Sequence, residues 1–110
     1  MVTNVLPDEL IRKATNIAGE LAWAPPDARD VIEYLQNLHI AVVGLELWLR
    51  EGNEPKVIGW SSYDVPFEGD WDSFVQKNAV AAKRELDRSI PDDAVINLTW
   101  ISRADLTKKT

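Results

Sequence analysis

Carboxylates between residues 64 and 72 are the side chains with the clearest capacity for chemistry. Asp64 and Glu68 precede the triplet Asp70-Trp71-Asp72. Carboxylates this close together can act as general acid and base or bind Mg²⁺ or Ca²⁺. The alternating D-x-D-x-D-G ligands of a calcium loop are absent, and Asp70 and Asp72 suit the cap and first turn of a helix. We therefore expect no catalytic and no metal-binding residue here.

Other reactive side chains are scarce. His39 is the single histidine, cysteine is absent, and the five glycines are isolated from one another. The chain therefore contains no thiol nucleophile, no histidine-rich or thiolate metal site and no glycine loop that could cradle a phosphate. His39 falls where a helix should meet a strand, and there it would interact with terminal helix carbonyls. We expect no cofactor and no enzymatic activity.

The charge of the chain favours one class of partner. A net charge of −6 over 110 residues repels nucleic acid and anionic membranes, and it attracts a basic protein. No apolar run approaches the roughly 18 residues of a membrane helix. The start of the chain, MVTNVLPDEL, lacks the basic and apolar regions of a signal peptide. With no cysteine present, we expect a cytoplasmic protein.

Five tryptophans are many for a chain of this length. Trp71 and Trp100 follow apolar patterns and are expected in the core. Trp48 and Trp60 have polar neighbours on adjacent predicted strands, so with Tyr63 they could form an exposed face that anchors a partner. The alternative is that these tryptophans pack under the first helix or the tail.

Periodicity predicts the helices that position these residues. Helical spacing over Asp8–Leu21 predicts a first helix, which Trp23-Ala24-Pro25-Pro26 ends. Asp27 should cap a second helix, which leaves through Asn37 in a left-handed conformation. A third helix should follow Asp70 and extend to Ser89.

Strand patterns lie between and after the helices. Apolar alternation over His39–Leu49 predicts a strand central to its sheet, with Ala41, Val43, Leu45, Leu47 and Leu49 on one face. Lys56–Tyr63 follows a turn and should pair with it as a hairpin. Ala94–Ser102 is the third predicted strand.

Together these elements predict a single α+β domain over residues 1–110, with a flexible tail at 103–110. Its order is α-α-β-β-α-β, and its small, three-stranded, mainly antiparallel sheet carries helices packed on one face.

The order of several short motifs resembles that of a known family. The motifs are Trp23 with Pro26-Asp27-Ala28, the apolar strand, the Trp60 strand, an acidic glycine-containing loop, and W-x-x-F-V at Trp71, Phe74 and Val75. Over roughly residues 23–86 this resembles the small immunity proteins of bacterial polymorphic toxin systems, which bind and neutralise a cognate toxin. Gly69-Asp70 stands where that family is expected to have a glutamate and a small polar residue.

The leading hypothesis is an acidic domain that binds a protein partner, with a basic toxin domain as the partner that the resemblance implies. Its predicted partner-binding residues are Trp48, Trp60, Tyr63, Asp64, Glu68 and Asp72. One alternative is a small enzyme or ligand-binding domain whose pocket combines carboxylates with a tryptophan. Another is a homodimeric scaffold in which an exposed sheet face pairs with itself.

Overall fold

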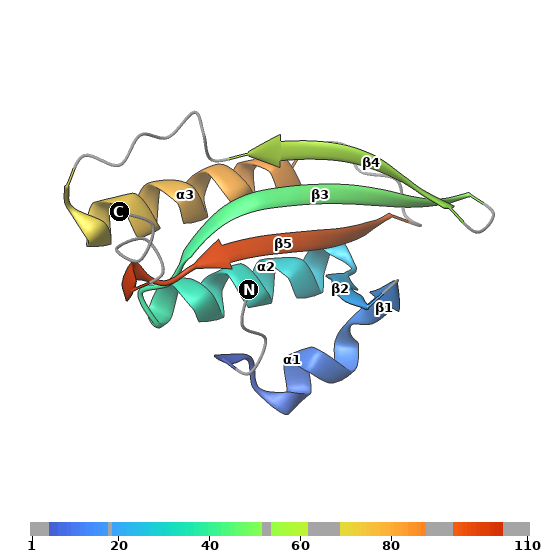
Figure 1. Cartoon of the computed structure of the whole chain (residues 1–110), viewed down its shortest axis with the longest axis horizontal. Coiled ribbons are helices and arrows are strands. Elements are labelled where there is room, and N and C mark those ends of the chain that lie inside the picture. The colour runs from blue at the N-terminus through green and yellow to red at the C-terminus, as the bar shows by residue number, and fades with distance from the viewer. Residues whose placement is uncertain (1–4, 18, 52–53, 62–68, 88–93, 105–110) are drawn as a thin grey trace.

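The architecture is a sheet with helices packed against it (Figure 1). The structure, a computed structural model, describes residues 5–17, 19–51, 54–61, 69–87 and 94–104. Its elements are α1 (Asp8–Lys13), β1 (Thr15–Ile17), β2 (Glu20–Trp23), α2 (Pro25–Asn37), β3 (Ala41–Glu51), β4 (Glu54–Ser61), α3 (Trp71–Leu86) and β5 (Val95–Ile101). The predicted α+β class is confirmed. The predicted strand number and order are wrong, because the sheet has five strands in the order β1-β2-β5-β3-β4.

The last strand in the sequence occupies the middle of the sheet. β5 lies between β2 and β3, and every described strand pairing is antiparallel. It follows that β2 and β3 run parallel to each other with β5 between them, and that β4 and β5 run parallel with β3 between them. Helices α2 and α3 make these two crossovers, as in split β-α-β units. The predicted β3–β4 hairpin is confirmed, and β3 is an interior strand that pairs on both sides, next to the edge strand β4.

The predicted helix over residues 8–21 ends early. α1 stops at Lys13 because Ala14 is extended, with φ −75° and ψ 149°. The chain then turns back on itself, since Ile17 pairs with Glu20 across a two-residue connection. Gly19 adopts φ +86°, and its N–H donates to Oδ1 of Asn16 at 3.0 Å. A glycine tolerates this left-handed backbone and Asn side chains favour turns, so local turn chemistry prevails over helical spacing here.

Helix α2 begins earlier than predicted. Pro25 occupies its first turn and Ala24 is the N-cap, whereas Asp27 lies inside the first turn. Proline suits this position because its missing N–H would have no partner there and its fixed φ is already helical. The proline pair therefore starts the second helix, as well as separating it from the preceding strand.

The end of α2 is a Schellman motif centred on the histidine. His39 adopts φ +59°, its N–H donates to the Gln36 carbonyl, and the Ile40 N–H donates to the Leu35 carbonyl, each at 3.0 Å. The left-handed residue is therefore His39, and the prediction of Asn37 is wrong because Asn37 is still helical. Ile40 and Leu35 also share the main core, which provides the apolar contact typical of this motif.

A β-bulge changes which side chains of β3 face the core. Val42 pairs with Trp100 and Gly44 with Thr99, which leaves Val43 as the extra residue. The predicted unbroken apolar face from Ala41 to Leu49 is therefore wrong. After the bulge Leu45 and Leu47 share a face with Val42, and all three contact the main core.

The main core lies between the helices and one face of the sheet. Buried residues come from all three helices and from β2, β3 and β5, including Leu10, Trp23, Val31, Ile32, Leu35, Val42, Leu45, Ala79, Ala82, Ile96, Leu98 and Trp100. Trp71 packs with Phe74, Val75 and Ala41 in a second cluster. Trp71 and Trp100 are thus core residues, as predicted.

Helix α3 begins where the sequence predicts, and it contains one buried polar side chain, Asn78, that was not predicted. Asp70 is the N-cap by position, without a side-chain capping hydrogen bond, and the helix ends at Leu86. Within its apolar stripe Asn78 is fully buried. Its Nδ2 donates to the Phe74 carbonyl at 2.8 Å, while its Oδ1 has no hydrogen-bond partner among the described residues. Ser89 and residues 105–110 of the expected tail lie outside the described residues, and Arg103 and Ala104 are helical.

Trp23 provides a test of how the first segment is held to the core. Its indole is 1% exposed and donates to the Leu10 carbonyl at 2.8 Å. Trp23→Phe removes this donor, leaves a buried carbonyl without its partner and creates a small cavity. We expect the free energy of unfolding to fall by about 2–3 kcal/mol in urea denaturation.

The matched control for Trp23→Phe is Val80→Ala, at an exposed position of α3. It should change the free energy of unfolding by less than about 0.5 kcal/mol. Equal effects of the two substitutions would contradict the anchoring role of Trp23.

Candidate partner-binding surface

The six predicted partner-binding residues divide into three groups in the structure. Trp48 and Asp72 are described with their side chains. Trp60 lies in β4, of which the backbone alone is described. Tyr63, Asp64 and Glu68 lie outside the described residues.

Trp48 is buried and not part of an exposed face. Its side chain is 4% exposed and packs with Ala22 of β2 and Val95 of β5. Its Nε1 donates to Oε2 of Glu46 at 3.1 Å. The hypothesis that Trp48 is exposed is therefore wrong, and its indole instead holds the exposed carboxylate of Glu46 in place. Glu46 is not among the six predicted partner-binding residues.

The pairing of β3 with β4 separates the two strand tryptophans. Trp48 pairs with Val57, whereas Trp60 pairs with Leu45. Residues directly opposite each other in an antiparallel ladder share a face of the sheet, and positions 45 and 48 are on opposite faces. The predicted common face of Trp48 and Trp60 is therefore wrong, because the register of the β3–β4 hairpin places the two residues on opposite faces.

Asp72 lies at a junction between the two long helices. Its Oδ1 is 3.1 Å from Nδ1 of His39, and both side chains are largely exposed, at 76% and 71%. Beside this pair, the Nε1 of Trp71 donates to the His39 carbonyl at 2.7 Å. The start of α3 is thus tied to the end of α2 by one buried indole and one surface pair. The sequence predicts separate local roles for these residues, His39 at terminal helix carbonyls and Asp72 in the first turn of a helix, and 33 positions separate them.

Ion pairs between α2 and α3 neutralise charged side chains near the end of α3 more than near its start. Arg29 pairs with Asp87, and Lys83 with Glu33 at 3.4 Å, so α2 and α3 are bridged near the end of α3. At its start Asp70 is exposed and forms no described ion pair, and Asp72 pairs with His39 alone among the described side chains. The two exposed carboxylates at the start of α3 therefore have one described ion-pair partner between them, His39.

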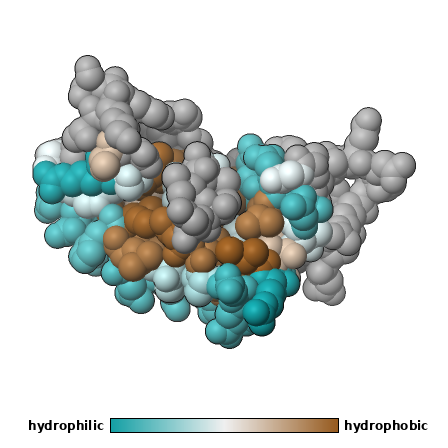
Figure 2. Space-filling view, turned by 60° about the horizontal axis from the view of Figure 1, so that its bottom comes forward, coloured by the Kyte–Doolittle hydropathy of each residue, from teal (hydrophilic) through white to brown (hydrophobic). Residues whose placement is uncertain are grey.

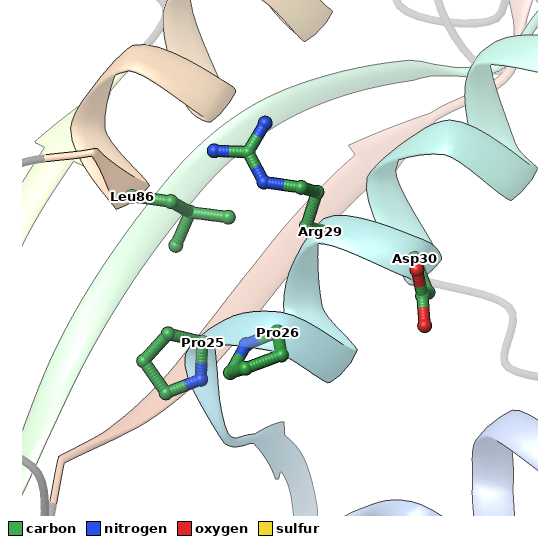
Figure 3. Close-up of a pocket in the computed structure, with 5 residues that line it drawn as sticks. All are labelled: Pro25, Pro26, Arg29, Asp30 and Leu86. Carbon is green, nitrogen blue, oxygen red and sulfur yellow. The ribbon is translucent and has the colours of Figure 1, made fainter.

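A depression of about 440 Å³ lies where α2 begins and α3 ends. Pro25, Pro26, Arg29, Asp30 and Leu86 line it (Figure 3). Arg29 and Leu86 extend toward the gap between the helices, whereas Asp30 points away. The guanidinium of Arg29 already donates to Asp87 and, at 3.5 Å, to the Lys83 carbonyl. The described residues that line this depression provide one carboxylate and no tryptophan.

Figure 2 shows a face on which apolar surface forms a band between hydrophilic regions. Exposed apolar surface with a polar border favours contact with another protein.

Among the described residues, no group of three histidine, aspartate or glutamate side chains is placed to share a metal ion. The described helices are all too short or too polar to cross a membrane.

Comparisons of the chain with models of protein families, with curated proteins and with solved structures found no match. The resemblance to immunity proteins therefore depends on the sequence motifs alone.

The left-handed conformation of His39 gives a test of whether its side chain serves stability. The left-handed conformation costs an L-residue about 1–2 kcal/mol of stability, whereas glycine adopts it freely. The exposed pair with Asp72 stabilises the fold by less than about 1 kcal/mol. We expect His39→Gly to raise the free energy of unfolding by up to about 1 kcal/mol, measured by chemical denaturation.

Asp72→Asn is the control for His39→Gly, because it keeps the shape of the side chain and removes its charge. It should change the free energy of unfolding by less than about 0.5 kcal/mol. A clear loss of stability in His39→Gly would mean that the imidazole stabilises the helix junction by more than its exposed contact suggests.

Proposed function

We propose that this protein binds and inhibits a partner protein, in the manner of an immunity protein that neutralises a toxin domain. The observation that carries this proposal is the exposed acidic start of α3, where Asp70 and Asp72 flank the buried Trp71. Trp71 fixes this turn to the His39 carbonyl, so the two carboxylates are presented from a rigid element. Rigid charges lose little entropy when a partner binds them.

The predicted acidic loop is continuous in sequence with this surface. Asp64 and Glu68 precede α3 directly, and we propose that they extend the same acidic region. Tyr63, also close in sequence, would supply an aromatic anchor. A partner of opposite charge would be steered toward this region, which raises the association rate and the selectivity more than the affinity. We propose a basic toxin domain as this partner and the cytoplasm as the place of binding.

A non-catalytic role agrees with the side chains that are available. The sequence has a single histidine and no cysteine. The backbone of His39 ends helix α2, and its side chain contacts Asp72. The depression between α2 and α3 has apolar walls and a guanidinium already engaged by Asp87. We propose that the protein acts by blocking a partner rather than by transforming a substrate.

The proposal predicts which substitutions slow the capture of a partner. The probe is the C-terminal domain of a large secreted protein encoded by the neighbouring gene, purified and titrated against the intact chain. Asp72→Asn and Glu68→Gln should each lower the association rate constant by roughly three- to tenfold, with little change in dissociation. Tyr63→Ala should weaken affinity by roughly thirtyfold through faster dissociation.

Glu9→Gln is the matched control, because it removes one exposed carboxylate from α1, which lies away from the start of α3 in Figure 1. It should leave both rate constants within about twofold. Absence of binding by the neighbouring gene product would refute the proposed function. Binding that none of these substitutions changes would refute the surface.

A further inference from the structure

The two edges of the sheet differ in length. At one edge β1 has three residues, whereas at the other β4 has eight, or roughly 27 Å of strand. Among the described strands β4 is hydrogen-bonded to β3 alone, and it forms the outer edge of the sheet in Figure 1. An edge strand presents a row of N–H and C=O groups that can pair with another strand.

Residues that discourage edge pairing are confined to one end of β4. Glu54, Pro55 and Lys56 are the charges and proline that protect sheet edges, whereas residues 57–61 include neither. The protected end belongs to a two-stranded ribbon, because the pairing of β5 with β3 stops at Trp48, opposite Val57. The unprotected residues 57–61 therefore belong to the part of β4 that is backed by both β3 and β5.

We propose that residues 57–61 of β4 pair, antiparallel, with the same residues of a second copy of this chain, across a two-fold axis at Gly59. The two sheets then form one continuous sheet through β4. In this register Ile58 of each copy lies opposite Trp60 of the other, and β-branched residues opposite aromatic ones form favourable cross-strand pairs. Gly59 meets itself at the axis, where a glycine lets two backbones approach closely.

A second copy fits this edge better than a charged partner does. No like charges face each other within residues 57–61, and a two-fold axis gives a closed contact that uses the same residues twice. A basic partner, in contrast, would find no carboxylate on the segment itself. Glu46 pairs in register with Gly59 and brings one carboxylate per copy near the axis. Since both copies are also acidic overall, screening by salt should strengthen the dimer.

The first measurement is sedimentation equilibrium of the intact protein over a roughly hundredfold range of concentration, at about 0.05 M and about 0.5 M salt. The expected result is a monomer–dimer equilibrium with more dimer at high salt. A monomer at every concentration and at both salt levels would overturn the proposal. Weaker association at high salt would overturn the assignment to this uncharged edge.

Charge substitutions at the axis test the register. Gly59→Lys places a cation opposite Glu46 within each chain, which favours the folded monomer, and places two cations together at the dimer axis. We expect the dimer dissociation constant to rise at least roughly tenfold. Gly59→Glu should also dissociate the dimer, and an equimolar mixture of the two variants should restore it, because opposite charges then meet across the axis.

Thr99→Lys is the control, because it makes the same charge change at an exposed position of the central strand β5. It should leave the dissociation constant within about twofold. A dimer that survives Gly59→Lys, or a mixture that stays monomeric, would overturn pairing at Gly59. These results are independent of whether a toxin domain binds, so the two proposals can fail separately.

Discussion

The insertion of β5 between β2 and β3 is the interaction on which the rest of the fold depends. Without it the chain has two separate hairpins, β1–β2 and β3–β4, each with an uncovered apolar face. Ile96, Leu98 and Trp100 of β5 are all buried, and they join these hairpins and the three helices into one core. The insertion of β5 pairs residues that are far apart in sequence, such as Trp23 with Ile96. Such contacts make folding slow relative to that of helical proteins.

Sequence patterns predicted the elements whose residues follow one strong period. The β3–β4 hairpin, the start of α3 and the β5 strand all follow such periods, and the described apolar residues of α3 and β5 pack in the core as expected. The first hairpin was missed because three- and four-residue strands carry too few alternations to outweigh helical spacing. Gly19 was the available signal, since an isolated glycine before a new apolar pair favours a turn.

The candidate surface was harder to predict because it depends on strand register and on contacts between elements that are distant in sequence. Leu45 pairs with Trp60 and Trp48 with Val57, so the register of the hairpin places the two tryptophans on opposite faces, and a one-residue difference in register reverses such an assignment. The contact between His39 and Asp72 joins the ends of two helices, and no local pattern links them. Histidine also gives little indication of a left-handed conformation, which explains why Asn37 looked like the better terminus.

Asn78 shows that this core is not optimised for stability. Its Oδ1 is buried without a hydrogen-bond partner among the described residues, although a buried acceptor left unpaired costs about 1–3 kcal/mol. An apolar residue of similar volume would fill the same space without that penalty, and it would lose only the bond from Nδ2 to the Phe74 carbonyl, which already serves the helix backbone. A substitution at this one position of α3 could therefore raise the stability of the fold and offset destabilising substitutions elsewhere in the chain.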